Sequence, residues 1–218
     1  MKKTMLSAAA VAVALATAVP AQADMLLGGT VGADAWFSSA EINDAVDGGD
    51  NTVPSFYASF EHFVPLIPNA RIAYANIEAD AVAFKQTDLT AYYEILDNDL
   101  VSVDVGVSLI KFADGEYNAQ GHVQTFNDEW QPAIYGNVEI GFPMTPLTAF
   151  AEGNMGEFDG TSTLDAKAGL KFTIPLVAAD LNLRGGYRVM DYDFDAINNP
   201  LGGKVKLDGF FAGVEVDF

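Results

Sequence analysis

Side chains suited to acid–base chemistry are scarce in this sequence. It has two histidines, His62 and His122, and no cysteine, which excludes a thiol nucleophile, a disulfide and a cysteine-ligated metal site. His62 stands beside Glu61, and the segment around His122, residues 113–130, contains no serine. A nucleophile, a base and an orienting group cannot be placed together. The sequence therefore predicts no catalytic or cofactor-binding residue, and a hydrolase is the least favoured interpretation.

Charged residues of both signs alternate with other residue types in several segments. Residues two or four positions apart share one face of a strand, as Arg184 and Arg188 would. The charged residues predicted to face inward together are Asp104, Glu152, Asp165, Lys167, Lys171, Arg184, Arg188 and Glu215. They indicate either the selectivity lining of a small pore or a network of ion pairs that plugs a narrow barrel. The plug is favoured, because side chains just fill a barrel of about eight strands and buried charges need partners.

Three aspartates, Asp191, Asp193 and Asp195, alternate at the end of one of these segments. Hard divalent cations prefer oxygen ligands. One hypothesis is that an acidic rim here holds Ca²⁺ or Mg²⁺ and bridges lipopolysaccharide phosphates. The segment lacks the central glycine of an EF-hand loop, so a solvated acidic rim without a metal is the favoured interpretation.

The N-terminal residues have the layout of a secretion signal. Lys2 and Lys3 precede an apolar run over residues 5–19, and Ala21-Gln22-Ala23 resembles a cleavage site. The run is shorter than the ~20 residues that a spanning helix needs. A cleaved signal peptide over residues 1–23 and one domain over residues 24–218 are therefore predicted.

With Lys2 and Lys3 removed, 9 basic residues remain against 30 acidic ones, a net charge of −21. This charge excludes the basic footprint of a nucleic-acid-binding protein.

Hydrophobic residues recur with a period of two along most of the chain, which is the pattern of β-strands. Short connections follow every second strand and longer polar ones follow the others, as in outer-membrane barrels with short periplasmic turns. This predicts an all-β, transmembrane, antiparallel up-and-down barrel of ten strands with both termini in the periplasm. Eight strands remain the alternative if residues 71–97 are misread. The predicted strands are 25–38, 52–63, 70–84, 87–97, 100–112, 131–142, 147–158, 161–174, 180–194 and 204–218.

The apolar face of these strands is predicted to contact lipid, because outer-membrane barrels carry an apolar band outside and polar residues inside. Aromatic residues near strand ends are typical of interfacial girdles; they are Phe56, Phe60, Phe63, Phe142, Phe172, Tyr192, Phe194 and Phe218. In the last strand, apolar residues occupy every second position counted back from the terminal phenylalanine. Its outward residues, which would form a signal for the barrel assembly machinery, are Phe210, Val214, Val216 and Phe218.

Several ordered motifs resemble those of a known family. They are Glu61-His62-Phe63-Val64-Pro65-Leu66-Ile67-Pro68-Asn69, Tyr92-Tyr93-Glu94-Ile95-Leu96-Asp97-Asn98, Ala151-Glu152-Gly153-Asn154, Gly186-Tyr187-Arg188 and Leu207-Asp208-Gly209. The family is a proteobacterial group of small outer-membrane β-barrel proteins named for a Gly-Gly motif. The resemblance implies an outer-membrane barrel and brings no assigned activity.

Together these patterns predict a monomeric barrel of the bacterial outer membrane, in contact with its lipid and lipopolysaccharide. The favoured role is structural or mediated by surface loops, with a narrow lumen plugged by charges. The alternative is a small diffusion pore for cations or small solutes.

Overall fold

The computed structural model describes residues 27–42, 46–64, 66–98, 100–119, 122–126, 128–193 and 203–218. The predicted signal peptide lies outside these residues. None of the described residues belongs to a helix that is long and apolar enough to cross a membrane. The strands that they form are β1 (Leu27–Ile42), β2 (Val46–His62), β3 (Asn69–Glu78), β4 (Val82–Asp97), β5 (Val101–Ala119), β6 (His122–Phe126), β7 (Glu129–Gly141), β8 (Leu147–Phe158), β9 (Thr161–Pro175), β10 (Asp180–Asp193) and β11 (Lys204–Asp217).

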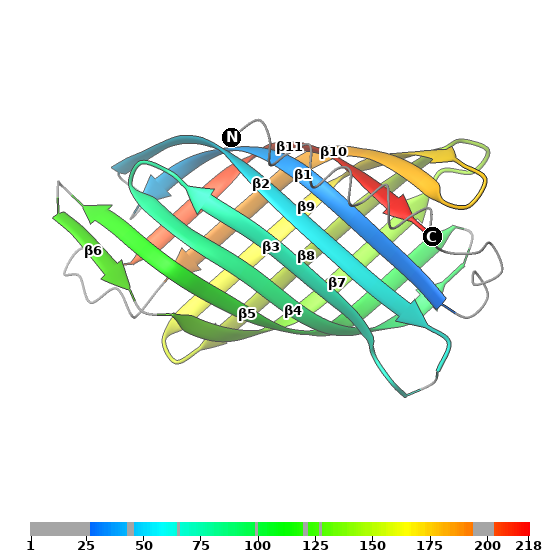
Figure 1. Ribbon diagram of the computed structural model, residues 1–218, viewed down its shortest axis with the longest axis horizontal. Coiled ribbons are helices and arrows are strands. Elements are labelled where there is room, and N and C mark those ends of the chain that lie inside the picture. The colour runs from blue at the N-terminus through cyan, green and yellow to red at the C-terminus, as the bar shows by residue number, and fades with distance from the viewer. Residues whose placement is uncertain are drawn as a thin grey trace.

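Ten of these strands close into a barrel. Each pairs antiparallel with its neighbours in chain order, and the β1–β11 and β4–β5 pairings complete the ring. Within the described ranges, β6 pairs with β5 alone and extends a hairpin beyond the ring (Figure 1). The predicted ten-stranded antiparallel barrel is confirmed. The eight-stranded alternative is wrong, because β3 and β4 are both full members of the ring.

The two ends of the barrel differ. The turn end holds the C-terminus, the start of β1 and the four short connections at residues 63–68, 98–100, 142–146 and 176–179. There Gly29 and Phe218 exchange backbone hydrogen bonds of 2.8 and 2.9 Å across the β1–β11 seam. The opposite end, here the loop end, carries the β5–β6 hairpin, at the left of Figure 1. The predicted placement of the short connections is confirmed.

Several predicted strand boundaries are wrong at the loop end. The predicted loop 39–51 is largely strand, since Ala40 pairs with Gly49 and Glu41 with Asp47. The predicted loop 113–130 contains the end of β5 and all of β6. The turn between β3 and β4 lies at residues 79–81 and not at residues 85–86. The predicted loop 195–203 lies almost wholly outside the described residues.

The alternation of side chains explains these differences. Toward the turn end the outer face is apolar, as predicted: Val107 and Leu109 are exposed, whereas Asp104 and Ser108 are buried inside. Toward the loop end the pattern inverts. Ile110 is completely buried inside, and Lys111 stands on the outer face. At this end the strands continue beyond the apolar belt, and their outward residues are polar and exposed to water. In the sequence, such strand ends resemble loops.

The apolar outer surface forms a belt with aromatic residues toward both of its edges. The exposed aromatic residues of the outer face on the side of the turn end are Phe60, Phe63, Tyr93, Phe142 and Phe172, and those on the side of the loop end are Phe37, Phe56, Tyr74, Trp130, Tyr187 and Phe210. Such girdles are typical of barrel residues at membrane interfaces. Tyr192 was predicted to belong to a girdle and instead points inward, completely buried. Phe194 lies outside the described residues.

Inverted alternation fills the loop end of the lumen with apolar side chains, here called the loop-end core. Phe84, Phe112 and Tyr192 pack ring against ring, with centroids 5.1 to 6.0 Å apart. The other members are Trp36, Ala40, Ile42, Val53, Ala75, Ile77, Val82, Ile110, Met190, Val205 and Leu207. This part of the barrel resembles a water-soluble one, in which apolar residues point inward.

Candidate functional site

Three layers of side chains follow one another along the lumen. Below the loop-end core lies an ion-pair layer, and nearest the turn end lies a vestibule, a cavity of about 550 Å³. The residues of the ion-pair layer are Asp34, Tyr57, Arg71, Asp88, Glu152, Asp165, Lys167, Lys171, Arg184, Arg188 and Glu215. The alternation of eight strands directs these side chains to the barrel axis, so residues distant in sequence meet there.

Arg188 and Asp165 form the best-aligned ion pair of this layer. The Arg188 Nε and Nη2 atoms donate to the two Asp165 carboxylate oxygens at 2.9 and 2.7 Å. The guanidinium carbon also lies 4.8 Å from the centroid of the Trp36 ring. Gln86 donates to Asp165 at 3.2 Å and accepts from Tyr192 at 2.7 Å. The side chain of Gln86 thus links the ion-pair layer to the loop-end core by hydrogen bonds.

Three cationic side chains contact the ring of Tyr57. They are Arg71, Lys167 and Arg184, which lie 4.9, 4.9 and 5.0 Å from the ring centroid. Its hydroxyl donates to Glu215 at 2.5 Å and accepts from Arg184. The ring lies over Gly32 of the neighbouring β1, where a Cβ atom would stand 2.0 Å from a ring carbon. Glycine at that position therefore makes room for the tyrosine.

The remaining ion pairs cross-link the layer. Each of the cations involved has at least one carboxylate partner, which satisfies the requirement that buried charges be paired. The pairs are Arg71–Glu152 at 2.7 Å, Lys167–Asp34 at 3.5 Å, Lys167–Glu152 at 3.7 Å, Arg184–Glu215 at 2.7 Å and Arg184–Asp34 at 3.4 Å.

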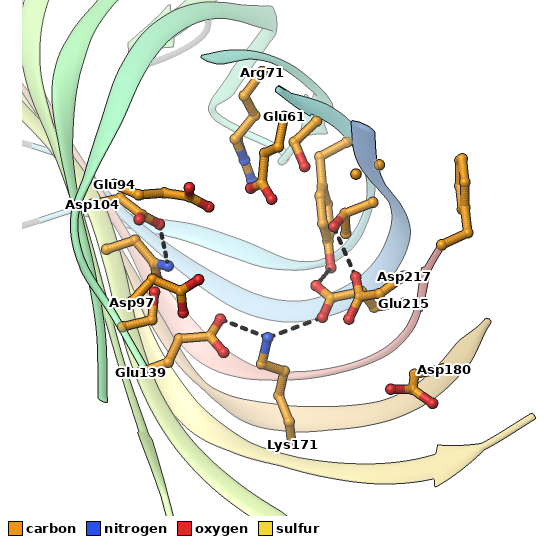
Figure 2. Close-up of a pocket in the computed structure, with 18 of the residues that line it drawn as sticks. Glu61, Arg71, Glu94, Asp97, Asp104, Glu139, Lys171, Asp180, Glu215 and Asp217 are labelled. Carbon is orange, nitrogen blue, oxygen red and sulfur yellow. Dashed lines mark hydrogen bonds and ion pairs between the residues drawn. The ribbon is translucent and has the colours of Figure 1, made fainter. Parts of the chain in front are cut away.

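The vestibule is strongly acidic. Nine acidic residues and two basic ones, Arg71 and Lys171, are among those that line it. The Lys171 ammonium bridges Glu139 at 2.6 Å and Glu215 at 3.0 Å, as Figure 2 shows. On another wall, in the same view, three carboxylates gather without a cation drawn beside them; they are Glu94, Asp97 and Asp104.

All eight charged residues predicted to face inward line the lumen. Seven of them take part in ion pairs with one another or with other lumen residues. Asp104 stands apart, at the wall of the vestibule. Its Oδ2 atom accepts a hydrogen bond from Asn137 at 3.0 Å, and its Oδ1 atom is buried without a hydrogen-bond partner.

Four important members of the layer were not among the predicted site residues. They are Asp34, Tyr57, Arg71 and Asp88. The alternation of inward and outward residues along each strand could have identified them. Arg71, for example, alternates with the outward residues Ala70 and Ile72 of β3. What the sequence did not indicate is which of the inward residues would meet across the axis.

The acidic rim and the histidines lie away from the lumen. Asp191 and Asp193 sit on the outer face of β10 near the loop end, and Asp195 lies outside the described residues. In the part of the chain that the structure describes, no group of three or more His, Cys, Asp or Glu residues is arranged to hold a metal ion. His62 ends β2 at the turn end and His122 begins β6 at the loop end, so the two histidines cannot act together.

The residues predicted as an assembly signal lie on β11 and just beyond it. Phe210 and Val214 project outward, with 70% and 47% of their surface exposed. Val216 shares their face, and Phe218 follows the strand and closes the seam with Gly29. Recognition of these residues by an assembly machinery stays a prediction.

An apolar, aromatic-edged belt outside and paired charges inside are the arrangement of a transmembrane β-barrel. The fold and the lumen thus define the class as a ten-stranded, antiparallel, up-and-down transmembrane barrel. No family model and no curated protein matches the chain.

Solved structures with a similar fold are barrels as well. Neisserial surface protein A is 15% identical, with 87% of this chain and 97% of that chain covered and a TM-score of 0.46. The β domain of the Bordetella autotransporter BrkA is 12% identical, with 88% and 99% covered and a TM-score of 0.46. The outer membrane protease OmpT from Escherichia coli is 7% identical, with 93% and 99% covered and a TM-score of 0.45. Likenesses at these levels say nothing about the activity of this chain.

Proposed function

We propose that this chain is a non-enzymatic barrel of the bacterial outer membrane whose lumen is closed and whose loop end serves the cell surface. The turn end, with the start of β1 and the C-terminus, would face the periplasm, since such barrels have short periplasmic turns. The belt would contact lipid and lipopolysaccharide, and the outward residues of β11 would be read by the barrel assembly machinery. The resemblance to the family named for a Gly-Gly motif agrees with this placement.

The loop-end core is the observation that carries the proposal of a closed lumen. Phe84, Phe112 and Tyr192 have at most 1% of their surface exposed, and rings packed as closely as this support a lumen closed to water at this layer. The ion-pair layer below it is held by bonds between strands on opposite sides of the barrel. A lumen packed in this way supports a structural or surface role for the barrel.

The length of the strands supports a role at the surface. A tilted transmembrane strand needs about 9–11 residues, whereas β1, β2 and β4 have 16, 17 and 16. The excess lies at the loop end, where polar residues face outward. This part would stand above the bilayer and present the loops to the exterior.

Planar-bilayer recording tests the proposal. The refolded barrel should insert without steady unitary currents, whereas a general porin recorded in the same bilayer gives the positive control. Steady unitary currents from this chain would contradict the closed lumen and favour the diffusion pore.

A further inference from the structure

The vestibule has more negative charge than its own cations neutralise. Nine carboxylates and two basic side chains are among its lining residues, and the two basic ones, Arg71 and Lys171, already have carboxylate partners. Charges that are partly withdrawn from water need compensation. Within the described part of the chain, six of the nine carboxylates have no ion pair. Half of these six gather on the wall formed by β4 and β5, where Figure 2 shows Glu94, Asp97 and Asp104.

Asp104 is the second, independent indication of a ligand. It is 7% exposed, and its Oδ1 atom is buried and has no hydrogen-bond partner. Its Oδ2 atom accepts from Asn137 at 3.0 Å, so the carboxylate is held in place. The side chain belongs to the lining of the vestibule. A buried acceptor without a donor is costly, and a ligand donor would remove that cost.

The ammonium group of Lys171 shows which kind of hydrogen-bond donor the carboxylates of the vestibule bind. The Lys171 ammonium fits between Glu139 and Glu215 at 2.6 and 3.0 Å. An ammonium group has three N–H donors and can therefore join carboxylates from different strands. The carboxylates on the wall formed by β4 and β5, which form no ion pair with a described residue, offer similar acceptors to the same cavity.

The spacing of the carboxylates favours an organic cation over a metal ion. Metal ions draw several ligands to within about 2.0–2.6 Å, and no described group of three or more acidic or histidine side chains is placed to do so. The cavity of about 550 Å³ falls within the range of roughly 300–1,000 Å³ that is usual for small-molecule sites. A flexible molecule with separated ammonium groups matches both facts.

We infer that the vestibule is a binding site for a linear polyamine, with one ammonium group held by Asp104 and Glu94. The ligand would enter from the turn end, where residues 176–180 form part of the rim. The inference goes beyond the proposed function and does not depend on it, because the same carboxylates line the vestibule whether or not the barrel conducts.

Calorimetric titration of the refolded barrel in a non-ionic detergent tests the inference, with spermidine as the probe at fixed ionic strength. The wild-type chain should bind one spermidine with a saturable heat. The Asp104→Asn and Glu94→Gln variants should each weaken binding about tenfold, the equivalent of ~1.4 kcal/mol. The matched control is Glu157→Gln, which removes an exposed carboxylate near the loop end and should leave the affinity unchanged.

Heat-modifiable migration on a gel first establishes that each variant is folded. Should Asp104→Asn fail to fold, Glu94→Gln provides the same test, since Glu94 is an exposed residue. The inference is overturned by any of three results: no saturable heat, equal loss of affinity in Glu157→Gln, or the same saturable heat with Mg²⁺ as with spermidine. None of these results bears on conductance, so the proposed function is judged separately.

Discussion

At the scale of single residues, Arg188 shows how the lumen is held together. It makes two hydrogen bonds to Asp165 and stacks on Trp36. A buried ion pair often adds little net stability compared with apolar side chains of similar size. Removing one partner is costly, however, because it leaves the other charge buried without compensation.

We therefore expect Arg188→Met to lower the free energy of unfolding by about 3–5 kcal/mol, measured by urea unfolding in lipid vesicles. The control is Lys85→Met, which breaks the pair with Asp114, whose side chains are 46% and 68% exposed. Exposed pairs of this kind contribute little, so the control should unfold almost as the wild type does. Similar effects of both substitutions would contradict the view that the Arg188 pair is protected from water.

The same residues show what the sequence could and could not reveal. Arg184 and Arg188 were expected to share the inner face because they stand four residues apart on one strand, and both lie in the lumen. Their partners were not foreseen in full: Asp34, which pairs with Arg184, is 150 positions away. Strand parity determines the face of a residue locally, whereas contacts across the axis depend on the register of the whole ring.

At the scale of elements, the long strands have two parts with opposite patterns. On β11, Phe210 and Val214 face outward, whereas Val205 and Leu207 are completely buried inside. The change marks the point at which the outer surface leaves the belt. A period of two was enough to identify the strands, but polar outward residues beyond the belt made the strand ends resemble loops. This explains why the predicted loops at residues 39–51 and 113–130 proved to be largely paired.

The belt can be tested on one face of one strand. Val107 lies within the belt and is 64% exposed, and Lys111 lies on the same face of β5, nearer the loop end. In lipid vesicles, Val107→Lys should lower the free energy of unfolding by about 2–4 kcal/mol, because a lysine near the middle of the bilayer is unfavourable. The reciprocal substitution Lys111→Val should change it little. An unaffected Val107→Lys barrel would show that this face does not contact lipid.

At the scale of the whole molecule, the two ends of the lumen differ: a cavity lies toward the turn end, and buried apolar side chains fill the loop end. The vestibule lies toward the turn end, and the ion-pair layer and the loop-end core follow it. The count of ten strands could be predicted because each strand carries its own alternation. The apolar filling of the loop end could not be predicted, because apolar residues on an inner face look like those of a lipid-facing strand until the ring places them inside.

This one-ended lumen is the central claim, and the absence of cysteine from the chain allows it to be tested with single introduced thiols. Ser102 lines the vestibule, whereas Ser38 points inward near the loop-end core and is 3% exposed. In proteoliposomes with the turn end accessible, a water-soluble maleimide should label Ser102→Cys rapidly and leave Ser38→Cys unlabelled until the barrel is denatured. Equal labelling of both variants in the folded barrel would contradict the account, because it would require a continuous aqueous path through the lumen.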